Sequence, residues 1–280
     1  MRRGFFYCRC TCCRDSVGNL FDPKLNMPSQ FWQADNNRMR LRMDRFVALV
    51  DPCDPAKGVH DLLVDQQAIG HGQFLQIDLP FLSLPGTGTN CDCYIRGGDL
   101  VATYPEQAPA GVRAQIYWRA TSHPVAAALA AIELVASVQT SRLDSCPTIT
   151  TRSEMIARVA FQLVSLERGT FADLMAKPDH SASSDAPDAP QCYLFRLSST
   201  KYSYVEMVHP ADAYQTSWDG WLQGLDFRLQ LSHRLFPDRL EKGVILRARV
   251  LGVVLDRDGD QDAAVQHYAA FLNEELPLTT

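Results

Sequence analysis

Four groups of residues have side chains whose types and spacing can support chemistry. The first group lies between residues 209 and 221 and contains His209, Asp212, Trp218, Asp219 and Trp221. A histidine beside a carboxylate can transfer protons, and a tryptophan ring can stack on a ligand. The segment therefore predicts either a catalytic site built on His209, Asp212 and Asp219 or a binding loop built on the tryptophans. The structural alternative is that the tryptophans plug the open end of a β core.

The second group consists of arginines in segments whose apolar residues recur with a period of two. Six of them fall on faces predicted to be wet: Arg113, Arg119, Arg158, Arg196, Arg228 and Arg234. Guanidinium groups bind carboxylates and phosphates through paired hydrogen bonds, so a curved sheet would gather them into an anion site. The predicted ligand-binding residues are Arg113, Tyr117, Arg119, Arg228, Trp218 and Trp221. The alternative is a solvated face on which these arginines pair with acidic residues across strands.

The third group is an acidic turn over residues 256–262, in which aspartates alternate around Gly259. Calcium prefers oxygen ligands at such spacing, so Asp256, Asp258 and Asp260 are candidate ligands, and calcium is the one candidate cofactor. The spacing departs from an EF-hand, because Gly259 stands fourth rather than sixth when Asp256 is counted as the first residue. The alternative is a helix N-terminus, where the helix dipole favours acidic residues.

The fourth group comprises the nine cysteines of the 280-residue chain. Cys8, Cys10, Cys12 and Cys13 lie closer together than the ligand pairs of structural zinc sites. An odd number of cysteines in a long chain argues against a disulfide framework. The first residues also lack the apolar segment of a secretory signal. We therefore predict reduced thiols in a cytoplasmic protein.

Composition narrows the classes of function. Apolar residues make up 46% of the chain and charged residues 21%, and no apolar run approaches the ~18 residues that a membrane span needs. The formal charge is −5 with no sustained basic block, which argues against nucleic-acid and membrane-surface binding. No Walker, dinucleotide, G-x-S-x-G or H-E-x-x-H motif is present.

The segments that must position these residues are mostly typical of β-strands. Strands are predicted over residues 45–50, 74–82, 94–96, 100–104, 112–120, 132–138 and 154–164. Residues 225–235 and 245–255 are predicted to form a long antiparallel hairpin, broken at Pro237 and Gly243. His233 lies on an apolar face and is predicted to be buried and hydrogen-bonded. A helix is expected over residues 262–275, with Tyr268 and Phe271 buried against a sheet.

The predicted fold class is mainly antiparallel β (α+β), with the C-terminal helix packed on a sheet. Residues 1–44 are predicted to be an irregular cysteine-rich extension, residues 45–150 a first β unit, and residues 151–280 a second unit with a disordered loop at 177–190. Residues 192–210 resemble residues 93–105, and the strand order then repeats. Two explanations stay open: an internal duplication of two β-meander units, or two unrelated meanders.

Three hypotheses of function follow. The first is a non-catalytic cytoplasmic binding or interaction protein that uses the curved, arginine-bearing sheet face or the tryptophan loop. The second is a small-molecule hydrolase with His209 and a nearby aspartate as acid–base residues. The third is a calcium-assisted carbohydrate binder. The predicted partner is a protein or an anionic small molecule, with no nucleic acid or membrane, and the sequence does not indicate the oligomeric state.

Overall fold

The computed structural model describes residues 31–36, 38–70, 72–79, 91–107, 111–121, 128–176, 181–184, 189–224, 226–236 and 239–274. The first strands are β1 (Trp32–Asp35), β2 (Arg38–Met43), β3 (Phe46–Val50), β4 (Val59–Val64), β5 (Gln67–Ala68) and β6 (Gln73–Asp78). The next are β7 (Asp92–Arg96), β8 (Asp99–Gln107), β9 (Val112–Thr121), β10 (Ala128–Thr140), β11 (Asp144–Ser145), β12 (Thr150–Ser165), β13 (Thr170–Asp173) and β14 (Ser181–Ser184). The last are β15 (Cys192–Leu197), β16 (Tyr202–Val208), β17 (Gln215–Gln223), β18 (Asp226–Arg234), β19 (Leu240–Glu241) and β20 (Ile245–Asp256). The helices are the 3-10 turn η2 (Pro55–Lys57) and α1 (Asp260–Asn273).

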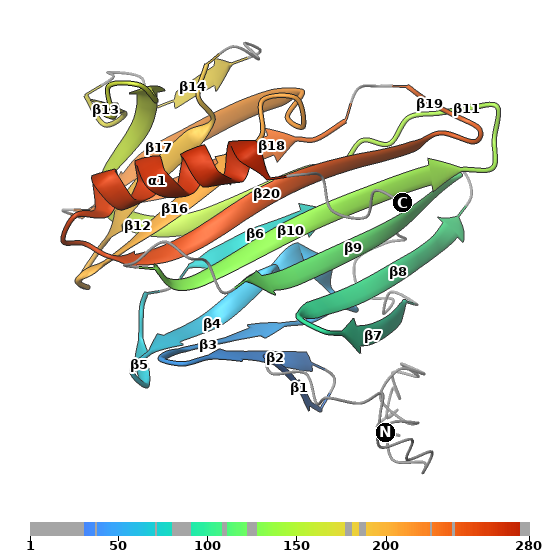
Figure 1. Cartoon of the computed structure of the whole chain (residues 1–280), viewed down its shortest axis with the longest axis horizontal. Helices are drawn as coiled ribbons and strands as arrows, with labels where there is room; N and C mark the ends of the chain where they lie inside the picture. Colours follow the sequence, from blue (N-terminus) through green and yellow to red (C-terminus); the bar gives the residue numbers. More distant parts are fainter. Residues whose placement is uncertain are drawn as a thin grey trace, which may run out of the picture.

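A large antiparallel sheet dominates the molecule (Figure 1). Its strands pair in the order β7-β8-β9-β10-β20-β16-β15-β12-β18-β17-β14. The sheet curls on itself, because His233 of β18 is hydrogen-bonded to Glu206 of β16 although β15 and β12 lie between them. The prediction of a mainly antiparallel β fold with one C-terminal helix is confirmed.

Alternation of side chains explains where the core lies. In β9, Ala114, Ile116 and Trp118 are completely buried inside the curl, whereas Arg113 on the other face is exposed. In β18, Leu229, Leu231 and His233 are buried in the same way, as their spacing predicts. One face of each strand therefore contributes to a shared core, and the other face is available for polar residues.

A smaller sheet, β1–β5, packs against this core. Strands β1 and β2 cover residues 32–35 and 38–43, so the predicted irregular extension ends earlier than expected. The reason is visible in β2, where Met39, Leu41 and Met43 are buried in alternation with exposed arginines. The pairing of Val59 with Phe74 joins β4 to β6, and β6 in turn pairs with β12 of the large sheet.

One close approach between the sheets needs a glycine. Gly58 has φ +59°, and a Cβ atom there would lie 2.3 Å from the carbonyl oxygen of Phe74. Both the left-handed backbone and the contact with β6 exclude a side chain at this position.

The predicted hairpin between residues 225–235 and 245–255 is wrong, although both segments are strands. Strand β18 pairs with β12 and β17, whereas β20 pairs with β10 and β16. The central part of β20 is buried on both faces, since every residue from Ala248 to Leu255 is buried. A strand that is buried on both faces lies inside a sheet that is packed against other elements on both faces. Strand β18 has one wet face, so it does not share this environment.

Helix α1 lies on the face of the large sheet opposite the core, across β15, β16 and β20 (Figure 1). Tyr268 and Phe271 are buried beneath it, as predicted. In its first turn Asp260 accepts hydrogen bonds from Arg196, at 2.9 Å, and from Ser203, at 2.7 Å. Within the described residues no helix is long and apolar enough to cross a membrane.

Some predictions concern residues whose structure is not described. Residues 1–30, with their four cysteines, lie outside the described residues, as does most of the predicted loop 177–190. Within that loop, residues 181–184 form β14, which pairs with β17.

Strands of the two predicted units pair with each other, β10 with β20 and β6 with β12. The internal duplication stays a prediction.

Candidate functional site

Strands β9, β10 and β20 carry polar side chains on the face turned away from the core. We call this set the polar face: Arg113, Gln115, Tyr117, Arg119, Glu133, Ser137, Gln139, Arg247 and Arg249. The register aligns them in rows, since Ser137 lies opposite Gln115 on one side and opposite Arg247 on the other. The period of two in each strand therefore brings nine residues from three strands onto one surface.

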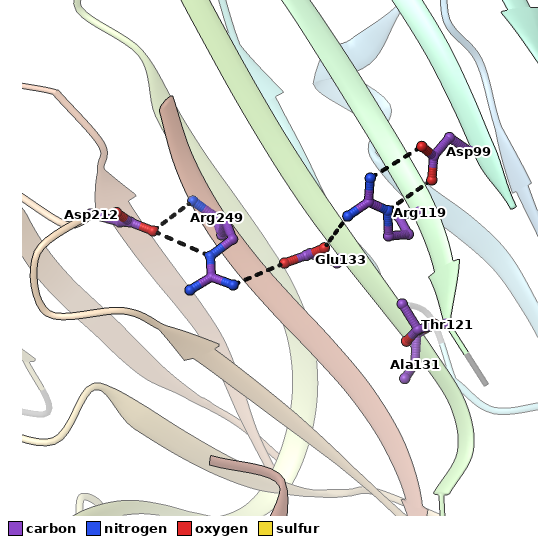
Figure 2. Close-up of polar contacts among 7 residues, drawn as sticks. All are labelled: Asp99, Arg119, Thr121, Ala131, Glu133, Asp212 and Arg249. Carbon is purple, nitrogen blue, oxygen red and sulfur yellow. Dashed lines mark hydrogen bonds and ion pairs between the residues drawn. The ribbon is translucent and has the colours of Figure 1, made fainter. Parts of the chain in front are cut away.

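A chain of alternating acids and arginines crosses one end of the polar face (Figure 2). Arg119 donates two hydrogen bonds to Asp99 of β8, at 2.8 and 3.1 Å, and a third to Glu133 at 3.3 Å. Glu133 also lies 3.8 Å from Nη1 of Arg249, whose Nε lies 3.8 Å from Asp212. The backbone N–H of Arg249 donates to the same Asp212 carboxylate at 3.1 Å. We call these five residues the acid–arginine chain. They link β8, β9, β10, β20 and the turn after β16.

Four of the five members of the acid–arginine chain are almost completely buried. Arg249, Glu133, Asp99 and Asp212 are each less than a tenth exposed. Burial raises the pKa of Glu133 above its ordinary value against the opposing pull of Arg119 and Arg249. Burial likewise raises the pKa of Asp212. Three carboxyl groups face two guanidinium groups, so one carboxyl is in excess and a proton on it relieves the imbalance.

Helix α1 closes this end of the polar face. The guanidinium carbon of Arg249 lies 4.7 Å from the centre of the Phe271 ring, a cation–π contact. Asp212, predicted to be catalytic, is therefore engaged by the backbone and side chain of Arg249 beneath the helix. Its neighbour His209 accepts the N–H of Ala211 through Nδ1, at 3.2 Å, on the outside of the turn.

The other end of the polar face is open and holds two arginines with no acid partner. Within the described part of the chain, no ion pair or hydrogen bond forms on the guanidinium of Arg113 or of Arg247, and Nε of Arg247 is buried without a partner. Both line a shallow hollow of about 160 Å³, together with Gln115, Tyr117, Ser137, Gln139 and Ile245. The Tyr117 hydroxyl donates to Gln115, which donates to Thr103 at 3.0 Å. Burial raises the pKa of Tyr117, so this hydroxyl is neutral at ordinary pH.

The remaining predicted ligand-binding residues lie on a different part of the sheet. The segment expected to be a tryptophan loop is mostly strand β17, because only residues 209–214 form the turn. Trp218 is buried, whereas Trp221 is 46% exposed and lies opposite Arg228 of β18, 5.9 Å from its guanidinium carbon. Arg228 also donates to Glu154 at 3.3 Å. The predicted set is therefore divided between β9 and the β17–β18 pair, and Asp219 is exposed on β17.

A second buried polar cluster lies inside the core. Glu206 is fully buried and accepts hydrogen bonds from Ser153, from Tyr204 at 2.5 Å and from His233 at 3.1 Å. The other ring nitrogen of His233 lies 2.9 Å from the hydroxyl of Thr216. The prediction that His233 is a buried, hydrogen-bonded residue is confirmed.

Two aspartates of the acidic turn after β20 interact with other residues of the chain. Asp256 lies 3.8 Å from Lys201, Asp260 is bound by Arg196 and Ser203, and Asp258 is exposed. In the described ranges no group of three or more His, Cys, Asp or Glu residues is arranged to hold a metal ion. Calcium binding stays a prediction.

A larger groove of about 860 Å³ lies between the small sheet and the β15–β16 turn. Its floor is apolar, with Val47, Leu49 and Ile156, and its acids are paired, Asp61 with Arg38 and Asp226 with Arg158. The groove also has Arg40 and Arg42 of β2 in its lining, and Arg40 is paired with Asp35 at 2.6 Å.

Sequence reasoning found part of the polar face and missed the rest. Arg113, Tyr117 and Arg119 were predicted from β9, whereas Glu133 and Arg247 were not assigned to a site. A signal for Arg247 was present in the sequence, because Arg247 and Arg249 interrupt an otherwise apolar face of β20. Only the pairing of β20 with β10 shows that these arginines meet the polar residues of β9.

Comparison with known proteins gives a likeness of fold. No protein-family model matches the sequence, and no curated protein matches it. A TPR-domain containing protein from Parabacteroides distasonis aligns with a TM-score of 0.50 and 7% identity, over 78% of this chain and 47% of that one. A galactose mutarotase related enzyme from Lactobacillus acidophilus aligns with a TM-score of 0.48 and 6% identity, over 79% and 98% of the two chains. A galactose mutarotase-like protein from Lactobacillus casei gives 0.48 and 7%, over 78% and 99%. The chain spans about half the length of the first of these proteins.

Proposed function

We propose that the chain is a non-catalytic binding protein that takes a small hydroxylated anion, such as a sugar acid, on the open end of the polar face. One observation carries the proposal: Arg113 and Arg247 line the same hollow and neither has an acid partner among the described residues. In a chain with a net charge of −5, two guanidinium groups left without a carboxylate form a site for an external anion.

The other residues of the hollow define the rest of the ligand. Gln115, Ser137 and Gln139 offer both donors and acceptors, which suit hydroxyl groups. Ile245 is 52% exposed and offers an apolar surface to the C–H face of a ring. The buried Nε of Arg247 needs a hydrogen-bond acceptor, and a bound carboxylate supplies one.

Calorimetric titration with D-glucuronate, D-glucose and sulfate tests the proposal. We expect glucuronate to bind at least ~10-fold more tightly than glucose, which lacks the carboxylate, a difference of about 1.4 kcal/mol. Sulfate, which has charge but no ring, is expected to bind more weakly than glucuronate.

Variants locate the binding. Arg247→Gln and Arg113→Gln are expected to lower the affinity for glucuronate by about 10-fold or more. Arg168→Gln is the matched control, because Arg168 is an exposed arginine in the turn between β12 and β13. Equal affinity for glucose and glucuronate, unchanged binding in both polar-face variants, or no binding of any of the three compounds would overturn the proposal.

A further inference from the structure

Two cysteines from distant parts of the sequence lie side by side where the small sheet meets the large one. Cys53 follows β3, and Cys91 immediately precedes β7. Their sulfur atoms are 3.7 Å apart. A disulfide has an S–S bond of about 2.05 Å, so the two sulfur atoms must move closer together for a bond to form.

The backbone around the pair holds it in place. The carbonyl oxygen of Pro52 accepts a hydrogen bond from the Tyr104 hydroxyl of β8, at 2.7 Å, and lies 3.4 Å from the Cys91 sulfur. The N–H of Cys53 donates to the side chain of Asp51 at 3.0 Å, which fixes the turn after β3. Both thiols are therefore presented to each other by ordered structure.

The two thiols differ in exposure, which suggests a division of roles. Cys53 is half-buried and open to a small oxidant, whereas Cys91 is only 4% exposed. The thiol of Cys91 stabilises a thiolate at Cys53 by hydrogen bonding and so lowers the pKa of Cys53, against the opposing effects of burial and of Asp51 and Asp54. The same hydrogen bond, together with burial, raises the pKa of Cys91. A thiolate is the reactive form, so Cys53 is the nucleophile.

We propose that Cys53 and Cys91 are a peroxide-reactive pair that closes a reversible disulfide between the turn after β3 and the start of β7. The Cys53 thiolate attacks hydrogen peroxide, breaks the O–O bond, becomes a sulfenic acid and releases hydroxide. The Cys91 sulfur then attacks the Cys53 sulfur, an S–S bond forms, and the S–O bond breaks to release water after proton transfer from Cys91. The sulfur pair loses two electrons to the peroxide, and a dithiol reductant restores both thiols.

The structural effect of this bond is a covalent link between the two sheets. Strand β7 pairs with β8, and β8 carries Asp99, the first member of the acid–arginine chain. Oxidation therefore fixes one edge of the sheet that bears the polar face to the β3–β4 connection, which is otherwise held there by hydrogen bonds and packing.

The experiment uses the full chain with Cys8, Cys10, Cys12 and Cys13 changed to serine, reduced and then exposed to rising hydrogen peroxide. Remaining thiols are alkylated, and peptides are mapped by mass spectrometry. We expect a peptide pair joined through Cys53 and Cys91, lighter by two hydrogens and restored by dithiothreitol, at ~10-fold less peroxide than is needed to oxidise the exposed Cys146.

Variants identify the order of events. In Cys91→Ser we expect a Cys53 sulfenic acid that dimedone traps, and in Cys53→Ser we expect Cys91 to stay reduced. Cys93→Ser should form the Cys53–Cys91 link as the parent does. The proposal is overturned if Cys146 is oxidised before any Cys53–Cys91 link appears, or if the link joins Cys93 instead.

Discussion

The carboxylate of Glu133 on β10 lies 3.8 Å from Nη1 of Arg249 on β20, and both side chains are almost completely buried. Arg249 is the cation shared by Glu133 and Asp212, so its charge is what allows two carboxyl groups to remain inside the protein. We therefore expect the acid–arginine chain to be sensitive to the loss of Arg249. We expect it to tolerate the loss of one carboxyl charge, because it has one carboxyl group more than it has guanidinium groups.

Replacing Arg249 with methionine is expected to destabilise the fold strongly. The variant keeps much of the side-chain volume beneath Phe271 but leaves Glu133 and Asp212 without their shared cation. Breaking one side of a buried ion pair costs about 3–5 kcal/mol. Urea unfolding measures the loss, and Arg168→Met, at an exposed position, is expected to change stability by less than ~0.5 kcal/mol. Equal stability of the two variants would contradict this role of Arg249.

The dependence of stability on pH has a defined sign. The pKa of Glu133 is raised in the folded protein, so the folded state binds its proton more tightly than the unfolded state does. This contribution is complete below the ordinary pKa of about 4.5 and is lost as the pH rises through the raised folded value. The side chain in Glu133→Gln does not ionise, so the variant lacks this dependence of stability on pH. We therefore expect the variant to gain stability relative to the parent over the pH range above about 4.5. Unfolding curves that stay parallel over that range would contradict the raised pKa.

The core carboxylate Glu206 is expected to act as a structural acceptor. Glu206→Ala removes the acceptor of three buried donors, on Ser153, Tyr204 and His233. Buried donors left without partners cost about 1–3 kcal/mol each, with more for charged groups. We expect a loss of at least ~3 kcal/mol by calorimetry. Glu206→Gln keeps an acceptor oxygen and should lose less, and the reverse order would contradict the role.

Two glycines with similar backbones separate strain from contact. Gly58 and Gly224 have φ of +59° and +69°, but a Cβ atom would meet the backbone of Phe74 and Gln76 only at Gly58. Gly224→Ala is expected to cost about 1 kcal/mol, the price of left-handed strain alone. Gly58→Ala should cost several times as much, because β6 must move. Similar melting temperatures for the two variants would show that the junction of the sheets yields easily.

The sequence predicted the faces of the strands better than their partners. Alternation in residues 112–120 and 225–235 correctly placed Trp118 and His233 inside and Arg113 outside. It could not show that β20 pairs with β10 rather than with β18, because a period of two specifies which side chains share a face and not which strand lies beside them. Helix α1 was easier to predict, since the acidic residues of its first turn and its apolar stripe are local signals.

The candidate site was likewise predicted only in part. Arg113, Tyr117 and Arg119 belong to one strand, so a local pattern was enough to group them. Arg247 and Glu133 are separated by more than a hundred residues, and no local pattern could relate them. The error over Trp218 and Trp221 has another origin, because a loop was predicted over residues 209–221, whereas residues 215–223 form a strand beside β18.

Strand β20 follows both of its neighbours in the chain, yet it lies between them in the large sheet, with β10 on one side and β16 on the other. In a nascent chain that has not reached residue 245, the long apolar edges of β10 and β16 have no strand to pair with between them. Such edges invite pairing with other chains, so ribosome-stalled or truncated products of this protein should depend on chaperones in a way that the finished molecule does not.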